Sequence, residues 1–437
     1  MSCFPVVPDR TPPPFRLEQA ADLARQARLV INKVTPNCNL SCSYCSAVAS
    51  RPDGSVERIA DDTFRRAVEL FVGGTREHAL EWLFHGGEPL LLPAGWYRAA
   101  MDLIEETAAA NPSLERLAYG VQSNVVALRQ DHLDLFVERR VIVSSSLDGT
   151  PEIHDLQRGR GQAVLRNVQR LAEAGVGGGV ITILTPANID HVEEILDFFA
   201  ANNVRGVKIN NLACVGRGRE AETITGRQYA GAMIACLRRM ARTRTVEPLN
   251  NDLLAMLEAF LFGRADEVPD RQSCYSYHCS GGRFFFGVEH DGDVYPCGRA
   301  ADTKRFRLFN LMDERLDLDA SRRALRDLHH KDAWYVRCFV CPARRICSFG
   351  CPAFEAGNPA EREIQCDFTR ELYQFFVQSP ELLSRVRQVL EETFSGASDE
   401  PPGIALAAQR GRDRPARAEH QDAGRAREKE RGEPWRS

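Results

Sequence analysis

Short apolar runs alternate with amphipathic stretches from residue 29 to residue 210. Six runs have the length and composition of strands: Leu29–Val34, Leu80–Phe84, Arg116–Val121, Val141–Ser146, Gly178–Leu184 and Gly206–Asn210. The stretches between them repeat apolar positions at helical spacing, at about 61–72, 94–110, 130–138, 163–174 and 190–201. This alternation predicts an α/β fold with a parallel sheet and helices outside it. Six such units predict a partial (β/α)6 TIM-like barrel, an open relative of the eight-fold barrel.

The polar and glycine-bearing segments of this region follow the predicted strands. A cysteine cluster follows the first strand, and the segments that follow the next three are His85–Pro89, Gln122–Asn124 and Ser146–Gly149. In a parallel barrel these segments all lie at the carboxyl ends of the strands, where ligands bind. Four separate parts of the chain are therefore expected to meet at one cavity mouth.

Beyond the barrel the pattern changes twice. Residues 226–262 have the periodicity of two helices, and a stretch rich in turns and cysteines follows. After residue 395 large apolar residues become rare, which is typical of disorder. The expected divisions are an irregular N-terminal arm (1–27), the partial barrel (28–225), a helical bridge (226–270), a small cysteine-rich domain (271–370), a C-terminal helix (371–395) and a disordered tail (396–437).

Composition and charge exclude several classes of protein. The 437 residues carry a formal net charge of -4, which gives no reason to expect binding to nucleic acid or to a membrane. No apolar run approaches the roughly 20 residues that span a bilayer. Residues 1–17 are rich in proline and lack the apolar core of a signal peptide. We therefore expect a cytoplasmic protein.

Fourteen cysteines are the unusual part of the composition. Three lie within residues 38–45, eight lie within residues 274–366, and Cys3, Cys214 and Cys236 stand outside these groups. The cytoplasm keeps thiols reduced, so the clustering favours metal sites over disulfides. Both iron–sulfur and zinc chemistry fit such clusters.

The first cysteine group has the spacing C-x3-C-x2-C, at Cys38, Cys42 and Cys45. A closed structural site normally takes four protein ligands. Three thiolates leave one metal position open to a substrate or cofactor. This openness is typical of a catalytic centre rather than a structural one.

Together with the motifs that follow the strands, this triad resembles the radical SAM enzymes. That family binds a four-iron (4Fe-4S) cluster through three cysteines, and S-adenosylmethionine chelates the open iron. The resemblance makes Cys38, Cys42 and Cys45 the cluster ligands. It also makes Tyr44, the aromatic residue before the third cysteine, a contact of the cofactor.

The resemblance extends to the segments after the second and third strands. Gly86, Gly87 and Glu88 match the family's GGE segment, which meets the methionine amino group. Glycine lets the backbone come close, and a carboxylate suits an ammonium group. Ser123 and Asn124 fit the same rim. The alternative for the GGE segment is an ordinary strand-to-helix turn.

After the fourth strand, Ser146, Asp148 and Gly149 form a Ser-x-Asp-Gly segment, and Arg158 follows ten residues after the aspartate. In the peptide-modifying branch of the family such a segment and a later arginine contact the ribose and the methionine carboxylate. A hydroxyl and a guanidinium suit those partners. The alternative for Arg158 is a solvated surface arginine.

The second cysteine group resembles the SPASM domain, a C-terminal extension of radical SAM enzymes that modify peptides and proteins. The C-x2-C-x5-C-x3-C spacing from residue 338 to residue 351 matches it, as do the flanking cysteines. The resemblance implies two auxiliary iron–sulfur clusters, and so three clusters in all. The first takes Cys274, Cys279, Cys297 and Cys351, and the second takes Cys338, Cys341, Cys347 and Cys366. Zinc is the alternative, because C-x2-C pairs are common zinc ligands.

The family's chemistry implies reductive cleavage of S-adenosylmethionine to a 5′-deoxyadenosyl radical, which abstracts hydrogen from a peptide or protein. An external donor of flavodoxin or ferredoxin type would supply the electron, and the auxiliary clusters offer a route for an electron leaving the product. We favour a ribosomally made peptide as the substrate and a thioether, carbon–carbon or related side-chain crosslink or oxidation as the product. No leader-binding module fits before the first strand, so a separate leader-binding protein is a possible partner.

Other functions stay open at this point. Two enzyme alternatives are formylglycine formation, as in anaerobic sulfatase maturases, and biosynthesis of a peptide-derived redox cofactor. In those maturases the catalytic base is an aspartate directly after the cysteine of a G-x4-C segment, where this chain has Gly298. The alternative outside the enzymes is a non-catalytic, zinc-bound scaffold.

The catalytic residue is left unassigned by the sequence. Glu289, Asp291 and Asp293 lie near Cys297, but a charged hairpin turn explains them better than a general base does. Among the remaining cysteines, Cys3 and Cys236 are most simply unliganded. Cys214 follows the sixth strand, where it is either a buried small side chain or a residue that faces the substrate.

Overall fold

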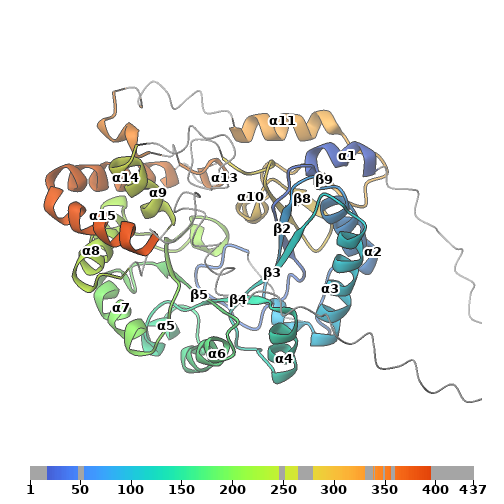
Figure 1. The fold of residues 1–437 in the computed structure, drawn as a ribbon, viewed down its shortest axis with the longest axis horizontal. Coiled ribbons are helices and arrows are strands. Elements are labelled where there is room, and N and C mark those ends of the chain that lie inside the picture. Colours follow the sequence, from blue (N-terminus) through green and yellow to red (C-terminus); the bar gives the residue numbers. More distant parts are fainter. Residues whose placement is uncertain are drawn as a thin grey trace, which may run out of the picture.

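The computed structural model describes residues 17–47, 54–245, 251–263, 279–329, 338, 340–347, 350–355 and 360–394. Cys3, Cys274, most of the N-terminal arm and the tail lie outside the described residues. The described strands form one sheet in the order β6-β5-β4-β3-β2-β1-β7-β8-β9, and helices pack around it (Figure 1).

The first six strands confirm the predicted parallel repeat. They are β1 (Leu29–Lys33), β2 (Ala79–His85), β3 (Arg116–Ser123), β4 (Ile142–Ser146), β5 (Gly177–Leu184) and β6 (Val207–Asn211). Each strand pairs in parallel with the next one along the chain. Figure 1 shows these strands curving around an interior, with the helices of the repeat outside them. This is the open α/β barrel that the alternating pattern predicts.

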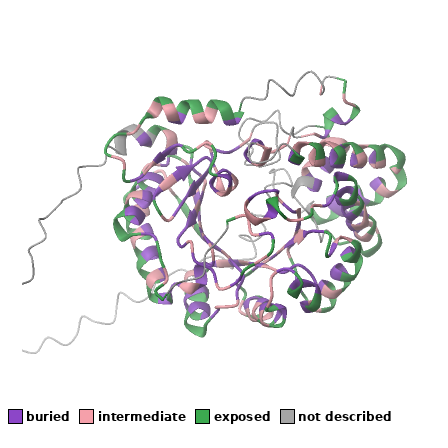
Figure 2. Ribbon diagram, turned by 180° about the vertical axis from the view of Figure 1, so that it is seen from behind, coloured by how far each residue is buried: buried purple, intermediate pink, exposed green. Residues whose placement is uncertain are grey.

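The β2 strand shows how alternation directs the two faces of the sheet. Trp82 and Phe84 are fully buried on the outer face, where they meet Phe64 and Trp96 edge to face at 5.7 and 6.0 Å between ring centroids. The alternate residues, which end with His85, face the interior of the barrel and are less buried. Figure 2 shows the same pattern of buried strands beneath partly exposed helices.

The predicted helices of the repeat are all present. They are α2 (Asp61–Val68) with its π-helical continuation η1 (Glu69–Gly73), α3 (Ala94–Ala109), α4 (Gln130–Arg139), α6 (Gly161–Glu173) and α7 (Val192–Ala201). The structure adds a short helix, α5 (Pro151–Asp155), between β4 and α6. The Thr150 hydroxyl caps α5 by accepting the Ile153 N–H at 3.3 Å. Five residues are too few to show a helical period, so the pattern did not reveal it.

The cysteine-rich region begins as part of the same sheet. Its first described strand, β7 (Phe285–Val288), pairs in parallel with β1, and β8 (Asp293–Tyr295) and β9 (Phe309–Asn310) continue antiparallel. The helices α10 (Gly298–Thr303) and α11 (Leu318–His329) follow β8 and β9. This region is therefore joined to the barrel through a continuous sheet, which the sequence did not predict.

The C-terminal helical part differs from the single helix expected over residues 371–395. The structure has two helices, α14 (Ala360–Gln378) and α15 (Pro380–Phe394). Proline lacks an N–H and constrains the residue before it, so the first helix ends before Pro380. The bridge forms α8 (Gly226–Thr243) and α9 (Asn251–Leu261), and α14 packs on α8 with Tyr229 and Phe368 stacked at 4.4 Å. No helix in the described chain is long and apolar enough to cross a membrane.

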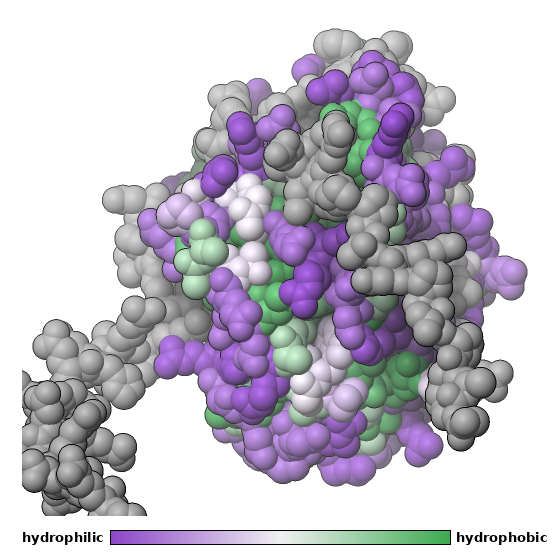
Figure 3. Space-filling model, turned by 90° about the vertical axis from the view of Figure 1, so that its right-hand side faces the viewer, coloured by the Kyte–Doolittle hydropathy of each residue, from purple (hydrophilic) through white to green (hydrophobic). Residues whose placement is uncertain are grey.

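The remaining short elements complete the described chain. They are α1 (Leu17–Ala24), α13 (Pro352–Glu355) and the 3-10 turns η2 (Pro89–Leu91), η3 (Ile189–His191), η4 (Gly216–Arg219) and η6 (Pro342–Arg345). On the face seen in Figure 3, hydrophilic side chains predominate and hydrophobic ones show in smaller areas between them.

Candidate active site

The triad loop runs from Cys38 to Cys45 after β1, and the GGE segment after β2 anchors its start. The Gly87 N–H donates to the Thr35 carbonyl at 2.8 Å, and the Glu88 N–H donates to the Asn37 carbonyl at 2.7 Å. Gly86 has φ +142°, and a Cβ there would lie 2.5 Å from the Thr35 oxygen. The two backbones are thus in direct contact, which only glycine permits here.

The three thiols of the triad differ in exposure. Cys38 is buried, whereas Cys42 and Cys45 are partly exposed. The Cys38 sulfur accepts the Leu40 N–H at 3.4 Å and lies 3.7 Å from the Asn124 amide nitrogen. Burial raises the pKa of the Cys38 thiol to about 12 and also raises the pKa of Cys42, although Arg158 opposes the latter shift. A bound metal would displace these protons, because thiolate is the form that ligates.

Hydrogen bonds of Glu88 link the segment after β2 to the end of β3. Its carboxylate is fully buried and accepts the Ser123 hydroxyl at 2.7 Å, the Asn124 N–H at 2.7 Å and the Leu90 N–H at 2.8 Å. Burial raises the pKa of Glu88 to about 7, against the effect of these hydrogen bonds. Ser123 and Asn124 therefore meet the GGE segment as expected. The contact of Glu88 with an ammonium group stays a prediction, since the structure shows its side chain holding protein groups.

Asp148 binds two other predicted residues, Tyr44 and Arg158. One carboxylate oxygen accepts the Arg158 Nε–H at 2.8 Å and the Tyr44 hydroxyl, and the other accepts the Ile183 N–H at 3.0 Å. The Arg158 guanidinium also lies 5.0 Å from the centre of the Tyr44 ring. Asp148 is fully buried and the Arg158 side chain is 11% exposed, so Arg158 is not a solvated surface residue.

The neighbours of Arg158 keep its guanidinium charged. Burial opposes the charge of Arg158, but Asp148, Tyr44 and Cys42 raise its pKa above the usual value. Burial raises the pKa of Tyr44 well above its usual value, so Tyr44 keeps its hydroxyl proton and donates it. Ser146 is half-buried at the carboxyl end of β4. Hydrogen bonds thus connect Glu88 with Ser123 and Asn124, and Asp148 with Tyr44 and Arg158.

Several residues outside the predicted set of cofactor contacts support this arrangement. His154 accepts the Asp148 N–H on Nδ1 at 3.2 Å, and the Asn188 amide donates to the Asp148 carbonyl at 3.2 Å. The segment after β6 clamps the triad loop: the Arg217 N–H donates to the Cys45 carbonyl at 3.0 Å, and its guanidinium donates to the Cys42 carbonyl at 3.2 Å. The only signal for Arg217 was its place after the sixth strand.

The second cysteine group is brought together in part. The set expected for the second auxiliary cluster lines one pocket, which holds Cys338, Cys341, Cys347 and Cys366. In the first set, Cys297 and Cys351 pack against the same small core beside α10. The Cys279 sulfur accepts the Gly281 N–H at 3.4 Å, next to the Gly282 N–H that donates to the Pro296 carbonyl at 2.8 Å. Cys274 lies outside the described residues.

No three His, Cys, Asp or Glu side chains in the described chain converge closely enough to hold one metal ion. Cys236 is buried in the core of α8, as an unliganded thiol would be, and burial raises its pKa to about 12. Cys214 is buried, and its N–H donates to Glu361 at 2.5 Å.

The three acidic residues near Cys297 belong mainly to the β7–β8 turn. Asp293 pairs with Arg307 at 2.6 Å, and the Asp291 carboxylate accepts the Asp293 N–H at 3.1 Å within the turn. Glu289 instead turns inward to Lys33, at 2.7 Å. The charged-turn interpretation therefore holds for Asp291 and Asp293, and Glu289 has a separate partner.

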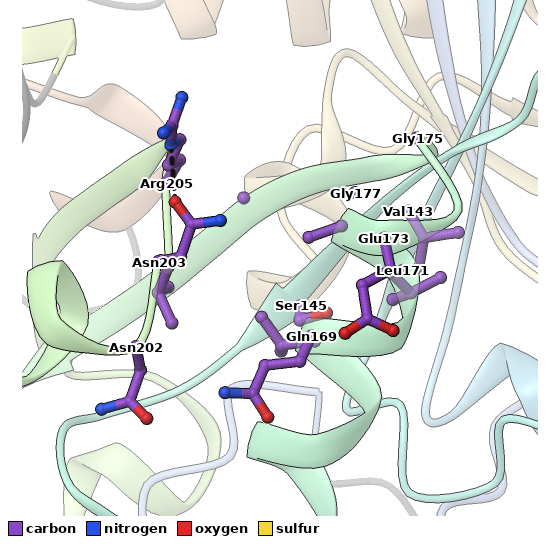
Figure 4. Close-up of a pocket in the computed structure, with 14 residues that line it drawn as sticks. Val143, Ser145, Gln169, Leu171, Glu173, Gly175, Gly177, Asn202, Asn203 and Arg205 are labelled. Carbon is purple, nitrogen blue, oxygen red and sulfur yellow. Dashed lines mark hydrogen bonds between the residues drawn. The ribbon is translucent and has the colours of Figure 1, made fainter.

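A larger pocket lies away from this site. It is lined by residues at the start of β5 and before β6, including Gly177, Asn203 and Arg205, and by Gln169 and Glu173 at the end of α6 (Figure 4). Arg205 donates to Asn203 at 2.9 Å within it. The pocket is therefore at the amino ends of strands whose carboxyl ends carry the triad face. In parallel barrels the chemistry lies at the carboxyl ends.

A comparison with protein-family models finds a match within the open barrel, over the residues that include the triad loop. Residues 32–199 match the model of the radical SAM superfamily. Residues 32–199 are therefore a radical SAM domain.

Similarity extends over most of the chain. A cysteine-type anaerobic sulfatase-maturating enzyme of Clostridium novyi is 23% identical over 83% of this chain and 97% of its own length. The structure of anSMEcpe with bound AdoMet has a TM-score of 0.67 at 19% identity, covering 88% of this chain and 99% of that one. Streptococcus suis SuiB bound to its precursor peptide SuiA has a TM-score of 0.54 at 13% identity, over 76% and 73%. Both structural likenesses show a shared fold.

Proposed function

We propose that this protein is a radical SAM maturase that cleaves S-adenosylmethionine reductively and modifies a peptide, with a crosslink as the favoured product. The observation that carries the proposal is the triad loop. The loop contacts two buried networks: Cys38 lies near Asn124 of the Glu88 network, and Tyr44 donates to Asp148. Each network includes residues that the sequence had linked to the cofactor.

The residues present fit a four-iron cluster with one open iron. Cys38, Cys42 and Cys45 are the only cysteines on the loop, and N–H groups of Leu40 and Asn124 approach the Cys38 sulfur. Such donors stabilise a thiolate. The cluster would supply the electron that cleaves S-adenosylmethionine. The chain's own part is to hold three thiolates, to orient the cofactor and to keep water from the radical.

The two networks divide the proposed binding of S-adenosylmethionine. The backbone of Gly86 and Gly87 gives close access on one side, and Ser123 and Asn124 complete that rim. On the other side Arg158 stays charged beside Asp148, which suits a carboxylate. Ser146 lies at the end of β4 and offers a hydroxyl to a ribose. Tyr44 ties this side to the triad itself.

The auxiliary clusters are proposed from the second cysteine group. The shared pocket of Cys338, Cys341, Cys347 and Cys366 supports one four-ligand site. The packing of Cys297 and Cys351 against one core supports another, with Cys279 and Cys274 as the further ligands. Four protein ligands would saturate each site, so these clusters would exchange electrons rather than bind substrate. An external flavodoxin- or ferredoxin-type donor remains part of the proposal.

The residue directly after Cys297 favours crosslink formation over formylglycine formation. Gly298 offers no carboxylate, and a Cβ there would lie 3.2 Å from Ile31 on β1. Glu289 and Asp302, the carboxylates that face this strand, both bind Lys33 at 2.7 and 2.6 Å. The base expected of a sulfatase maturase is thus missing from its position. A peptide substrate is supported by the precursor peptide bound to SuiB and by the Cp18Cys peptide bound to anSMEcpe.

Formylglycine formation is the second candidate, because the sulfatase-maturating enzymes are similar over most of both chains. The test is to incubate the anaerobically reconstituted protein, S-adenosylmethionine and dithionite with two peptides, one a cysteine-containing sulfatase peptide and one encoded beside the gene. Mass spectrometry that finds two hydrogens lost from the second peptide, with a new bond between side chains, supports the crosslink. Formylglycine in the first peptide overturns it in favour of the second candidate.

A further inference from the structure

A buried ion-pair network joins the triad loop to the helix that begins after Cys297. Lys33, the last residue of β1, donates to Glu289 at 2.7 Å and to Asp302 at 2.6 Å. The second oxygen of Asp302 accepts the Ser46 hydroxyl at 3.1 Å. Ser46 directly follows Cys45, and Asp302 lies on α10. We refer to Lys33, Glu289, Asp302 and Ser46 as the strand-end network.

The burial of this network makes its geometry costly to change. The side chains of Lys33, Glu289 and Asp302 are only 6, 7 and 18% exposed. A buried ammonium group must be paired, because desolvation is not otherwise compensated. Burial lowers the pKa of Lys33, but the two carboxylates more than reverse this and raise it, so the lysine stays charged. Burial likewise acts against Asp302, yet Lys33 holds the Asp302 pKa below its usual value.

These properties argue against proton transfer and for positioning. Both oxygens of Asp302 accept hydrogen bonds from protein groups, and its low pKa makes it a weak base. Its place is significant for another reason: α10 has Cys297 as its N-cap, with the Cys297 sulfur accepting the Ala300 N–H at 3.4 Å. One carboxylate therefore connects the neighbour of Cys45 with the helix capped by Cys297.

We propose that Asp302 and Ser46 are positioning residues, with Lys33 as their fixed counter-charge. They hold the triad loop in register with the second cysteine group, and thereby hold the open face of the triad against the residues that would bind S-adenosylmethionine. The proposal rests on the proposed function, because it concerns the placement of that site. It adds three residues that neither the sequence pattern nor the family match assigns.

The most selective variant is Ser46→Ala, which removes the tether and leaves the ion pairs intact. After anaerobic reconstitution we expect unchanged iron content and melting temperature and about tenfold weaker binding of S-adenosylmethionine, measured by equilibrium dialysis. The electron paramagnetic resonance spectrum of the reduced protein should respond less to added S-adenosylmethionine. Ser46→Thr keeps the hydroxyl and should restore both signals.

Asp302→Asn and Glu77→Gln form a matched pair. Asp302→Asn should lower the melting temperature and also weaken S-adenosylmethionine binding at least tenfold, since it changes the tether and the ion pair together. Glu77 pairs with Arg28 at 2.9 Å near the other end of β1, with side chains 16 and 24% exposed. Glu77→Gln should lower the melting temperature without weakening binding.

Three results separate the possibilities. Wild-type affinity in Ser46→Ala overturns the positioning role, and so does an Asp302→Asn protein that is less stable but binds normally. A wild-type protein that takes up no iron and binds no S-adenosylmethionine contradicts the proposed function itself. The first two results leave that function intact.

Discussion

The triad face of the barrel and the second cysteine group hold their chemistry in different ways. At the triad face, the buried Glu88 after β2 and the buried Asp148 after β4 each accept three hydrogen bonds from protein groups. In the second group, Cys341 and Cys351 directly precede the four-residue helices η6 and α13, and Cys297 directly precedes the six-residue helix α10. The first site is thus organised by protein hydrogen bonds, whereas under the proposed function the second site would depend on its metal.

Removing the triad should produce the largest effect on activity and a small effect on the fold. Cys38→Ala/Cys42→Ala/Cys45→Ala is expected to abolish formation of 5′-deoxyadenosine, because no ligand would hold the open cluster. The surrounding networks do not use Cys42 or Cys45 side chains, so the melting temperature should change by only a few degrees. Chromatography of the reaction and thermal melting would measure both. A variant that does not fold would contradict the idea of a protein-organised site.

Removing the second group should have the reverse pattern. Cys338→Ala/Cys341→Ala is expected to lose about four of about twelve irons per chain, since one four-iron site loses half its ligands. Product formation should stop while some cleavage of S-adenosylmethionine continues. The melting temperature of this region should also fall, because the bound metal would stabilise its short helices. Unchanged peptide turnover in a folded variant would contradict the electron-transfer role.

Asp148→Asn tests how strongly the protein organises the triad face. The change leaves the guanidinium of Arg158 buried without its charged partner, which typically destabilises by about 3 kcal/mol. Urea unfolding of the metal-free protein should show this loss. The control is Glu138→Gln, which breaks the exposed pair with Arg98 at 2.7 Å and should leave the unfolding free energy unchanged. Equal losses of unfolding free energy in the two variants would contradict a stabilising role for the buried Asp148–Arg158 pair.

Glu88 should give the same face a pH dependence of smaller size. Burial raises the pKa of Glu88 to about 7 from a usual value of 4.5. The folded chain then binds the proton more tightly than the unfolded chain, so this contribution is present at low pH and is lost as pH rises through about 7. The unfolding free energy should fall by about 2 kcal/mol between pH 5 and pH 8. Glu88→Gln should lack this slope, and an identical slope in both proteins would contradict the buried-carboxyl account.

Much of the barrel follows from local pattern. Each parallel strand is a short apolar run, and each polar motif comes where such a run ends, so the positions of Gly86, Ser123 and Asp148 could be predicted without a structure. The contacts of each side chain could not be predicted in this way. Glu88 binds the end of β3 rather than standing open, because the choice of partner depends on the curvature that brings strand ends together.

The second half of the chain was harder to predict for a different reason. Cysteine spacing predicted metal sites there, but the pairing of β7 with β1 joins residues more than two hundred positions apart and has no local signal. The same long-range pairing hid the strand-end network, since Lys33 and Asp302 meet only once the sheet is continuous. The single helix expected after residue 371 was wrong because Pro380 ends α14 within an otherwise helical pattern.

The central claim is that the triad holds an iron–sulfur cluster that cleaves S-adenosylmethionine. The most direct test reconstitutes the whole chain anaerobically, measures iron, sulfide and zinc, and follows 5′-deoxyadenosine after addition of S-adenosylmethionine and dithionite. The account predicts about twelve irons with matching sulfide, and 5′-deoxyadenosine that disappears when the triad is replaced by alanine. Zinc without iron, or 5′-deoxyadenosine formed equally by the triad variant, would contradict it.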